Sequence, residues 1–192
     1  EKVSSYLVEV YMNTRSYDAA LKSIDRIAKP SAQILEAKQK ILFQLGTQSF
    51  ANADFEQALK YLNQSIAIGQ YNRQTKADAY YWCGESYYRL NRMVEAARDF
   101  NAYLQLTTQP NNEMYALANY NLGYIAFHRK DYTQASNYFQ KYIQLEKGEN
   151  ATALADAYNR IGDCHLHVRN FEEAKQYYSQ AEQMNTSSGD YS

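Results

Sequence analysis

Four of the seven glycines in this 192-residue chain recur at a nearly constant spacing. They are Gly46, Gly84, Gly123 and Gly162, which lie 38, 39 and 39 residues apart. Twelve residues after each glycine comes an alanine, namely Ala58, Ala96, Ala135 and Ala174. Large apolar residues follow after nine and after sixteen positions, the latter being Leu62, Phe100, Phe139 and Tyr178. Such a period predicts stacked supersecondary units, which bury their apolar faces against their neighbours.

The same register extends towards the N-terminus, where Val8 takes the glycine column and Ala20 the alanine column. We therefore predict five repeats that begin near residues 1, 39, 77, 116 and 155. Together they form a single array over residues 1–184, and residues 185–192 are a polar tail or a junction to a further repeat.

Apolar residues within each repeat recur at steps of three and four, as in Tyr80, Cys83 and Tyr87. This spacing is typical of α-helices rather than strands, so each repeat is predicted to be a helix pair in an all-α fold. Short polar stretches such as residues 13–16, 52–54, 91–92, 129–131 and 169–170 mark the turns within pairs. Pro30, Gly69, Pro110 and Gly148 mark the junctions between pairs, where the candidate helix N-caps are Ser31, Asn72, Asn112 and Asn150.

A glycine in a helix costs about 1 kcal/mol relative to alanine, so four glycines at one phase require a packing reason. Apolar periodicity continues through them, which argues against helix ends. We predict that the paired helix approaches closely at each glycine, with the alanine twelve residues later facing the missing side chain.

Charge and composition exclude several classes of partner. Lys and Arg number 20 and Asp and Glu 21, and a net charge of −1 gives no overall field to hold nucleic acid or an anionic membrane. No run of about 18 apolar residues is present, so we expect no membrane insertion. Cys83 and Cys164 have no ligand-like spacing and are interpreted as core residues, a disulfide being the less favoured alternative.

The glycine, alanine and aromatic columns resemble the tetratricopeptide repeat over essentially the whole chain. The best copy, residues 79–88 (AYYWCGESYY) followed by Ala96 and Phe100, is similar to repeats of bacterial cell-envelope proteins, which favours the periplasm over the cytoplasm. The period of 38 to 39 exceeds the family's 34, which we assign to an extra helical turn or a longer junction loop. The resemblance implies a right-handed superhelical solenoid whose first helices line a concave face.

The register on those first helices predicts an aromatic groove that binds a peptide or segment of another protein. Tyr, Trp and Arg often anchor interfaces because they combine a large rigid area with a polar group. The predicted partner-binding residues are Phe43, Phe50, Tyr81, Trp82, Tyr88, Arg89, Tyr120, Asn121, Tyr124, Phe127 and Arg160. The alternative for these rings is packing between repeats, above all for Phe43, Phe50 and Phe127. We expect weak, micromolar-class binding.

Some members of the family clamp a partner's C-terminal carboxylate. Asn121 and Arg160 resemble part of that clamp, but Tyr81, Glu85 and Asp156 stand where its other residues would be, so we expect no clamp.

Catalysis, metals and cofactors find no support in the sequence, so the chain is predicted not to be an enzyme. His165 and His167 diverge by about 200° on a helix and cannot readily grip one metal ion. His128 has no identifiable Ser, Cys or carboxylate partner, and no glycine-rich phosphate loop occurs. The alternative function is a structural oligomerisation domain that pairs through the last helix near Ala174, Tyr177 and Tyr178.

Overall fold

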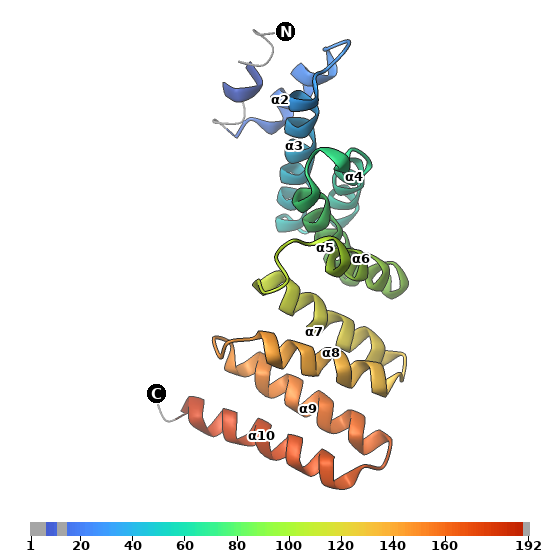
Figure 1. Cartoon of the computed structure of the whole chain (residues 1–192), viewed down its shortest axis with the longest axis vertical. Coiled ribbons are helices and arrows are strands. Elements are labelled where there is room, and N and C mark those ends of the chain that lie inside the picture. The colour runs from blue at the N-terminus through green and yellow to red at the C-terminus, as the bar shows by residue number, and fades with distance from the viewer. Residues whose placement is uncertain (1–6, 11–14, 190–192) are drawn as a thin grey trace. The chain divides into compact units, whose positions relative to one another are not determined.

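The structure is a computed structural model that describes residues 7–10 and 15–189 of the chain (Figure 1). The described residues form helices and turns and no strand, which confirms the all-α prediction. Contacts between residues divide the chain into two compact units, Glu1–Thr108 (unit 1) and Gln109–Ser192 (unit 2). No helix among the described residues is long and apolar enough to cross a lipid bilayer.

Unit 1 contains the second and third helix pairs, which are complete, and part of the first pair. The first repeat is represented by residues 7–10 and by α2 (Tyr17–Asp25). Residues 1–6 and the first half of the predicted turn at 13–16 lie outside the described residues. The second pair is α3 (Ala32–Ala51) with α4 (Phe55–Ala67), followed by the short 3₁₀ helix η1 (Gly69–Tyr71). The third pair is α5 (Arg73–Arg89) with α6 (Met93–Leu106).

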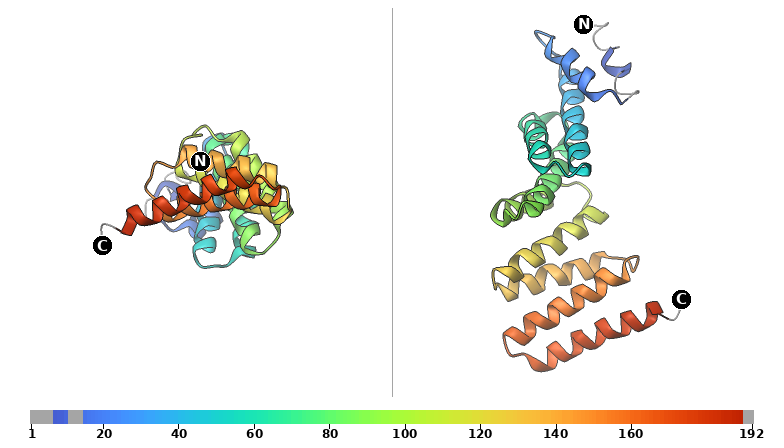
Figure 2. Two further views of the ribbon diagram at one scale, coloured as in Figure 1. Left: turned by 90° about the horizontal axis from the view of Figure 1, so that it is seen from below. Right: turned by 180° about the vertical axis from the view of Figure 1, so that it is seen from behind.

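Unit 2 contains the fourth and fifth predicted pairs. These are α7 (Glu113–His128) with α8 (Tyr132–Leu145), and α9 (Ala151–His167) with α10 (Phe171–Gly189). Figures 1 and 2 show these helices running in alternating directions, each beside the next. Helix α10 includes the first residues of the stretch 185–192 that the sequence marks as a polar tail.

The helix starts follow the predicted caps. At each of the four junctions the predicted residue accepts a hydrogen bond from the backbone N–H three positions on, which satisfies one orphan donor of the first turn. The four pairs are Ser31 with Ile34, Asn72 with Thr75, Asn112 with Tyr115, and Asn150 with Ala153. Junctions at residues 68–72, 107–112 and 146–150 separate the helix pairs.

The four in-register glycines lie inside the first helices and permit close approach of the second helix, as predicted, but the alanine does not fill the gap. A Cβ built on Gly84 would lie 2.7 Å from the ring of Phe100, sixteen residues on. Gly46, Gly123 and Gly162 likewise lie against Leu62, Phe139 and Tyr178. The alanines are buried beside this contact, and each repeat is therefore closed by a large side chain seated on a glycine.

Each turn within a helix pair is built around one residue with positive φ. The four complete turns contain Ala53, Asn91, Lys130 and Arg169, with φ of 59° to 63°, and Arg15 has the same conformation in the first repeat. In the turn after α3, the Asp54 N–H donates to the Ser49 carbonyl and the Ala53 N–H to the Phe50 carbonyl. This is the Schellman arrangement, in which position 53 is normally glycine.

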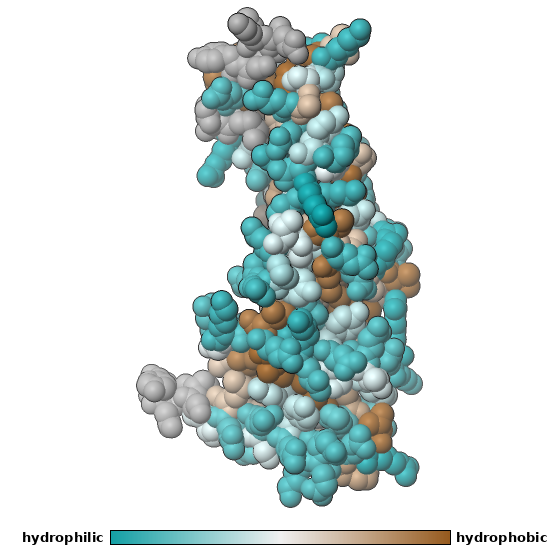
Figure 3. Space-filling view, in the orientation of Figure 1, coloured by the Kyte–Doolittle hydropathy of each residue, from teal (hydrophilic) through white to brown (hydrophobic). Residues whose placement is uncertain are grey.

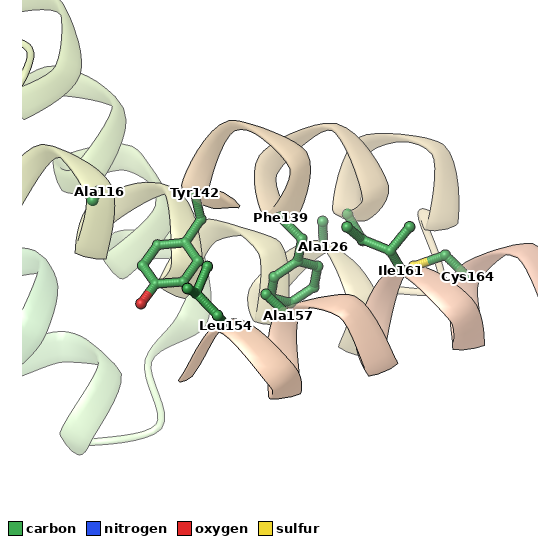
Figure 4. Close-up of a cluster of buried hydrophobic side chains, with 9 residues drawn as sticks. Ala116, Ala126, Phe139, Tyr142, Leu154, Ala157, Ile161 and Cys164 are labelled. Carbon is green, nitrogen blue, oxygen red and sulfur yellow. The ribbon is translucent and has the colours of Figure 1, made fainter. Parts of the chain in front are cut away.

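The unit 2 core is a row of side chains between neighbouring helices. Figure 4 shows Phe139 and Tyr142 of α8 beside Leu154, Ile161 and Cys164 of α9. Cys83 and Cys164 are buried free thiols, which confirms their assignment to the core. Burial raises the pKa of Cys164 to about 11, so its thiol is protonated at neutral pH.

We predict that Gly84→Ala destabilises the protein although alanine is the better helix former. The new methyl would meet a ring that is fully buried and cannot retreat, and overpacking of this kind costs about 1–3 kcal/mol. Urea unfolding of Gly84→Ala, Phe100→Leu and the double variant measures the effect. The double variant should lose less than the sum of the single losses, because leucine is smaller than phenylalanine and removes some of the ring atoms that the new methyl would meet. A Gly84→Ala protein as stable as the wild type would disprove the packing role.

We also predict that Ala53→Gly stabilises the protein by about 0.5–1 kcal/mol, since an L-residue with positive φ is strained and glycine is not. Position 53 is exposed, so no side-chain contact is lost. The matched control is Ala51→Gly, which lies two residues earlier in the helix, is equally exposed, and should lower the free energy of unfolding by up to about 1 kcal/mol. Equal effects at the two positions would contradict the prediction.

Candidate functional site

Three of the predicted contact residues of unit 1, Phe50, Trp82 and Arg89, form an aromatic cluster on α3 and α5. The rings of Phe50 and Trp82 meet edge to face with centroids 4.9 Å apart, and Phe55 packs on Phe50 at 5.2 Å. The guanidinium of Arg89 lies over the Phe50 ring at 5.8 Å, a cation–π contact. Trp82 is only partly buried and Arg89 is exposed, so this cluster holds a large aromatic side chain and a cation at the surface.

Tyr81 does not belong to a surface groove, and its assignment as a contact residue is wrong. It is 3% exposed and packs edge to face against Phe100 at 5.8 Å and Tyr103 at 5.4 Å. Its hydroxyl donates to Glu85 at 3.1 Å. The side chain is part of the α5–α6 core because the two aromatic residues of α6 cover it. Phe43 and Tyr88, from the same prediction, are half-buried.

In unit 2, two predicted tyrosines on α7 converge on one carboxylate of α9. The Tyr120 hydroxyl donates to Asp156 Oδ2 at 2.5 Å, and the Tyr124 hydroxyl donates to the same oxygen. The two rings meet edge to face at 5.2 Å, and both remain partly exposed. Asp156 therefore fixes the position of two aromatic side chains at once.

Arg160 continues this network along α9. Its guanidinium lies between two carboxylates, with Nη1 3.0 Å from Asp163 Oδ2 and Nε 3.6 Å from Asp156 Oδ1. Tyr178 of α10 donates its hydroxyl to Asp163 at 2.5 Å. The positive charge of Arg160 is therefore shared between two aspartates of its own helix.

Burial and the neighbouring carboxylates keep these phenols protonated. Burial, followed by the hydrogen bond to Asp156, raises the pKa of Tyr124 to about 12 and that of Tyr120 further above its usual range. Burial and the bond to Asp163 raise the pKa of Tyr178 to about 12. All three hydroxyls therefore act as hydrogen-bond donors at neutral pH.

The remaining residues of unit 2 that were predicted to contact a partner are Asn121 and Phe127. Asn121 is partly buried. Phe127 is half-buried and packs edge to face on Tyr132 at 5.6 Å and on His167 at 6.0 Å, so it contributes to packing as the alternative held.

Sequence reasoning missed Asp156, Asp163 and Tyr178 as members of the network. A signal was present, because Asp156, Arg160 and Asp163 follow one another at steps of four and three and so share one helix face. The tyrosines that complete the network come from other helices, up to 36 residues away, and no local pattern indicates them.

His165, His167 and the residues of α10 named above pack against neighbouring side chains. His167 stacks on Tyr132 at 4.3 Å and His165 stacks on Tyr177 at 5.4 Å, so the two imidazoles point to different neighbours. Among the described residues no three His, Cys, Asp or Glu side chains are grouped as metal ligands. Ala174, Tyr177 and Tyr178, which the oligomerisation alternative placed on an open face, instead pack towards α9.

Two family models, both of the tetratricopeptide repeat, match residues 43–113 and 114–187. A search of the curated proteins found no match. Similar solved structures include BtubC (BKLC) from P. vanneervenii, with a TM-score of 0.71 at 15% identity over 98% of this chain and 81% of that one. MamA gives 0.66 at 19% identity over 96% and 97% of the two chains. YrrB, described as a TPR protein with an unusual peptide-binding site, gives 0.64 at 16% identity over 92% and 82%.

We predict that alkaline pH weakens the fold through Tyr124. Its pKa rises from 10 in the unfolded chain to about 12 in the folded protein, so its contribution to stability is complete below pH 10 and is lost as the pH rises towards 12. Urea unfolding between pH 9 and pH 11.5 should show a shallower decline for Tyr124→Phe than for the wild type. Tyr71→Phe provides the matched control, because no carboxylate among the described residues accepts a hydrogen bond from the Tyr71 hydroxyl. Identical slopes for the wild type and Tyr124→Phe would rule out the Asp156 contact.

Proposed function

Because the chain belongs to the tetratricopeptide repeat family, we propose that it is an interaction module whose first helices bind an extended or helical segment of another protein. Members of this family are generally non-enzymatic scaffolds, and we propose no catalysis for this chain. The observation that carries the proposal is the pairing of Tyr120 and Tyr124 on Asp156, which holds two partly exposed rings in place before any partner arrives.

Pre-positioned aromatic side chains favour binding because little rotamer freedom is lost on association. In unit 2 the hydroxyls of Tyr120 and Tyr124 are tied to Asp156, so the exposed parts of their rings offer apolar area in a fixed orientation. Asn121 follows Tyr120 on α7 and is partly buried.

Unit 1 offers a second contact region of similar chemistry. Trp82 is held by Phe50 and Arg89 is held over the same ring, so an indole and a guanidinium are presented together. These side-chain types are enriched among residues that dominate interface energies. YrrB, which shares this fold, is described as binding peptide, which supports the same class of ligand here.

The oligomerisation alternative has less support. The three residues assigned to it on α10 pack towards α9. Of the exposed side chains near them, Phe171 is apolar and the others are charged or polar: Glu172, Glu173, Lys175 and Gln176. Light scattering at several protein concentrations should therefore show no stable dimer in the absence of a partner. A dimer that persists on dilution would favour the alternative.

We predict that peptides selected from a random library on the immobilised chain bind with micromolar affinity through these residues. Trp82→Ala and Arg89→Glu test unit 1, Tyr124→Ala tests unit 2, and fluorescence anisotropy measures the dissociation constants. At least one of these variants should bind about tenfold more weakly, which corresponds to about 1.4 kcal/mol. Lys141→Ala, at an exposed position of the second helix α8, is the control and should bind normally.

Thermal unfolding of each variant shows whether a loss of binding reflects a loss of fold. Peptides that bind all three test variants as tightly as the wild type would refute binding through the first helices.

A further inference from the structure

A pocket of about 440 Å³ lies in unit 2 where α7 begins, α8 ends and α9 begins. This volume is within the range of about 300–1,000 Å³ that is typical of small-ligand sites. Its inner wall is formed by Ala116, Leu117, Tyr142 and Leu145, and its rim by asparagine and charged residues. In Figure 3 apolar groups appear near these helix ends, bordered by hydrophilic ones. The pocket contains none of the residues predicted above to contact a partner peptide.

The hydroxyl of Tyr142 is the unusual group in this pocket. The residue is 2% exposed, yet among the described residues its hydroxyl has no hydrogen-bond partner. Figure 4 shows the oxygen at the end of the core row, directed away from Phe139. The corresponding position of the second repeat is Ser65, whose hydroxyl donates to the Gln39 carbonyl at 2.8 Å. The hydroxyl faces the pocket and is not used by hydrogen bonds of the described residues, so Tyr142 points to a ligand with which it would pair.

The rim of the pocket is acidic. It carries Glu113, Glu146 and Glu149 against one cation, Lys147. The carboxylate of Glu146 accepts the backbone N–H groups of Gly148, Glu149 and Asn150 at 2.6 to 3.1 Å, which fixes the loop between α8 and α9. Within the described part of the chain, the carboxylates of Glu113 and Glu149 have no hydrogen bond or ion pair. Two negative charges are therefore available above an apolar wall.

We propose that this pocket binds an alkylammonium group. The methylene stem lies along Leu117, Leu145 and the ring of Tyr142, and the ammonium donates to the Tyr142 oxygen and the rim carboxylates. An ammonium has three donors and no acceptor, which matches a phenol oxygen surrounded by carboxylates. The face of an aromatic ring also attracts a cation. The net negative rim disfavours anions, and a neutral alkyl chain would leave the hydroxyl unpaired.

The electrostatics of Tyr142 support this geometry. Burial, followed by the charges of Glu146 and Glu113, raises the pKa of Tyr142 to about 12. Its hydroxyl is thus neutral at physiological pH and feels the rim carboxylates. A bound cation would relieve that interaction and occupy the oxygen's lone pairs.

An alkylammonium group can belong to a lysine side chain of a partner segment or to a free diamine. Calorimetric titration of the whole chain with Nα-acetyl-lysine methylamide and, separately, with cadaverine distinguishes them by relative affinity. Both probes should bind with millimolar or tighter affinity, and 1-pentanol, which has the stem without the charge, should not. Equal binding of 1-pentanol and cadaverine, or no binding of either amine, would overturn the proposal.

Single substitutions test the assigned contacts. Tyr142→Phe and Glu113→Gln should each weaken amine binding at least about threefold, whereas Lys147→Gln, which removes the competing cation, should strengthen it. Tyr142→Phe should melt no lower than the wild type, because it removes a hydroxyl that has no partner in the free protein. Tyr103→Phe, the corresponding change in unit 1, should leave amine binding unchanged. Unaltered affinity in Tyr142→Phe, or weaker binding in Lys147→Gln, would refute the assignment.

Peptide binding by the first helices and amine binding by this pocket are tested with different variants, so either proposal can be refuted without the other. The residues tested for the first function, Trp82, Arg89 and Tyr124, do not line the pocket. A chain that loses one activity while retaining the other would show that the two sites are separate.

Discussion

The contact between a glycine of the first helix and a large side chain of the second underlies every described helix pair from the second repeat onward. With no Cβ in the way, Phe100 can lie directly over Gly84, and Phe139 over Gly123. Dispersion forces fall steeply with distance, so the close approach allowed by a missing methyl increases contact over the whole ring. The price is the lower helix propensity of glycine, which is about 1 kcal/mol per site. Helices this close also leave room only for the buried alanines beside the contact.

The same packing decides which aromatic side chains are available for binding. The chain has 20 tyrosines, but several of them, such as Tyr103 and Tyr142, are buried between helices and are not available to a partner. Tyr81 and Tyr120 occupy the same column, three residues before a glycine, yet only Tyr81 is fully buried. Both rings contact two aromatic rings of the second helix, and both have one ring of their own helix at 5.2 Å, Trp82 for Tyr81 and Tyr124 for Tyr120. Column position alone therefore does not assign a ring to the core or to the surface.

Sequence reasoning succeeded where the causes are local or periodic. The helix pairs, the four N-caps and the burial of both cysteines follow from spacing and from backbone hydrogen bonding within a few residues. It failed where side chains from different helices meet. The register could not show that Phe100, rather than Ala96, lies on Gly84, because both residues project from the same face of α6. Nor could it show that Tyr124 reaches Asp156, since rotamers and interhelix distance decide that contact.

The local charges of unit 2 have a consequence that the net charge of −1 conceals. Along α9, Asp156 and Asp163 outnumber Arg160, and at the pocket three glutamates outnumber Lys147. These charges act on a ligand that lies within a few ångströms of them. The charges of the rest of the chain are screened beyond about 8–10 Å at physiological salt. A ligand at either place meets an acidic surface on a nearly neutral protein. Under the proposals above, basic or amine-bearing segments would be favoured by local contacts, without the long-range steering that a highly charged chain would exert.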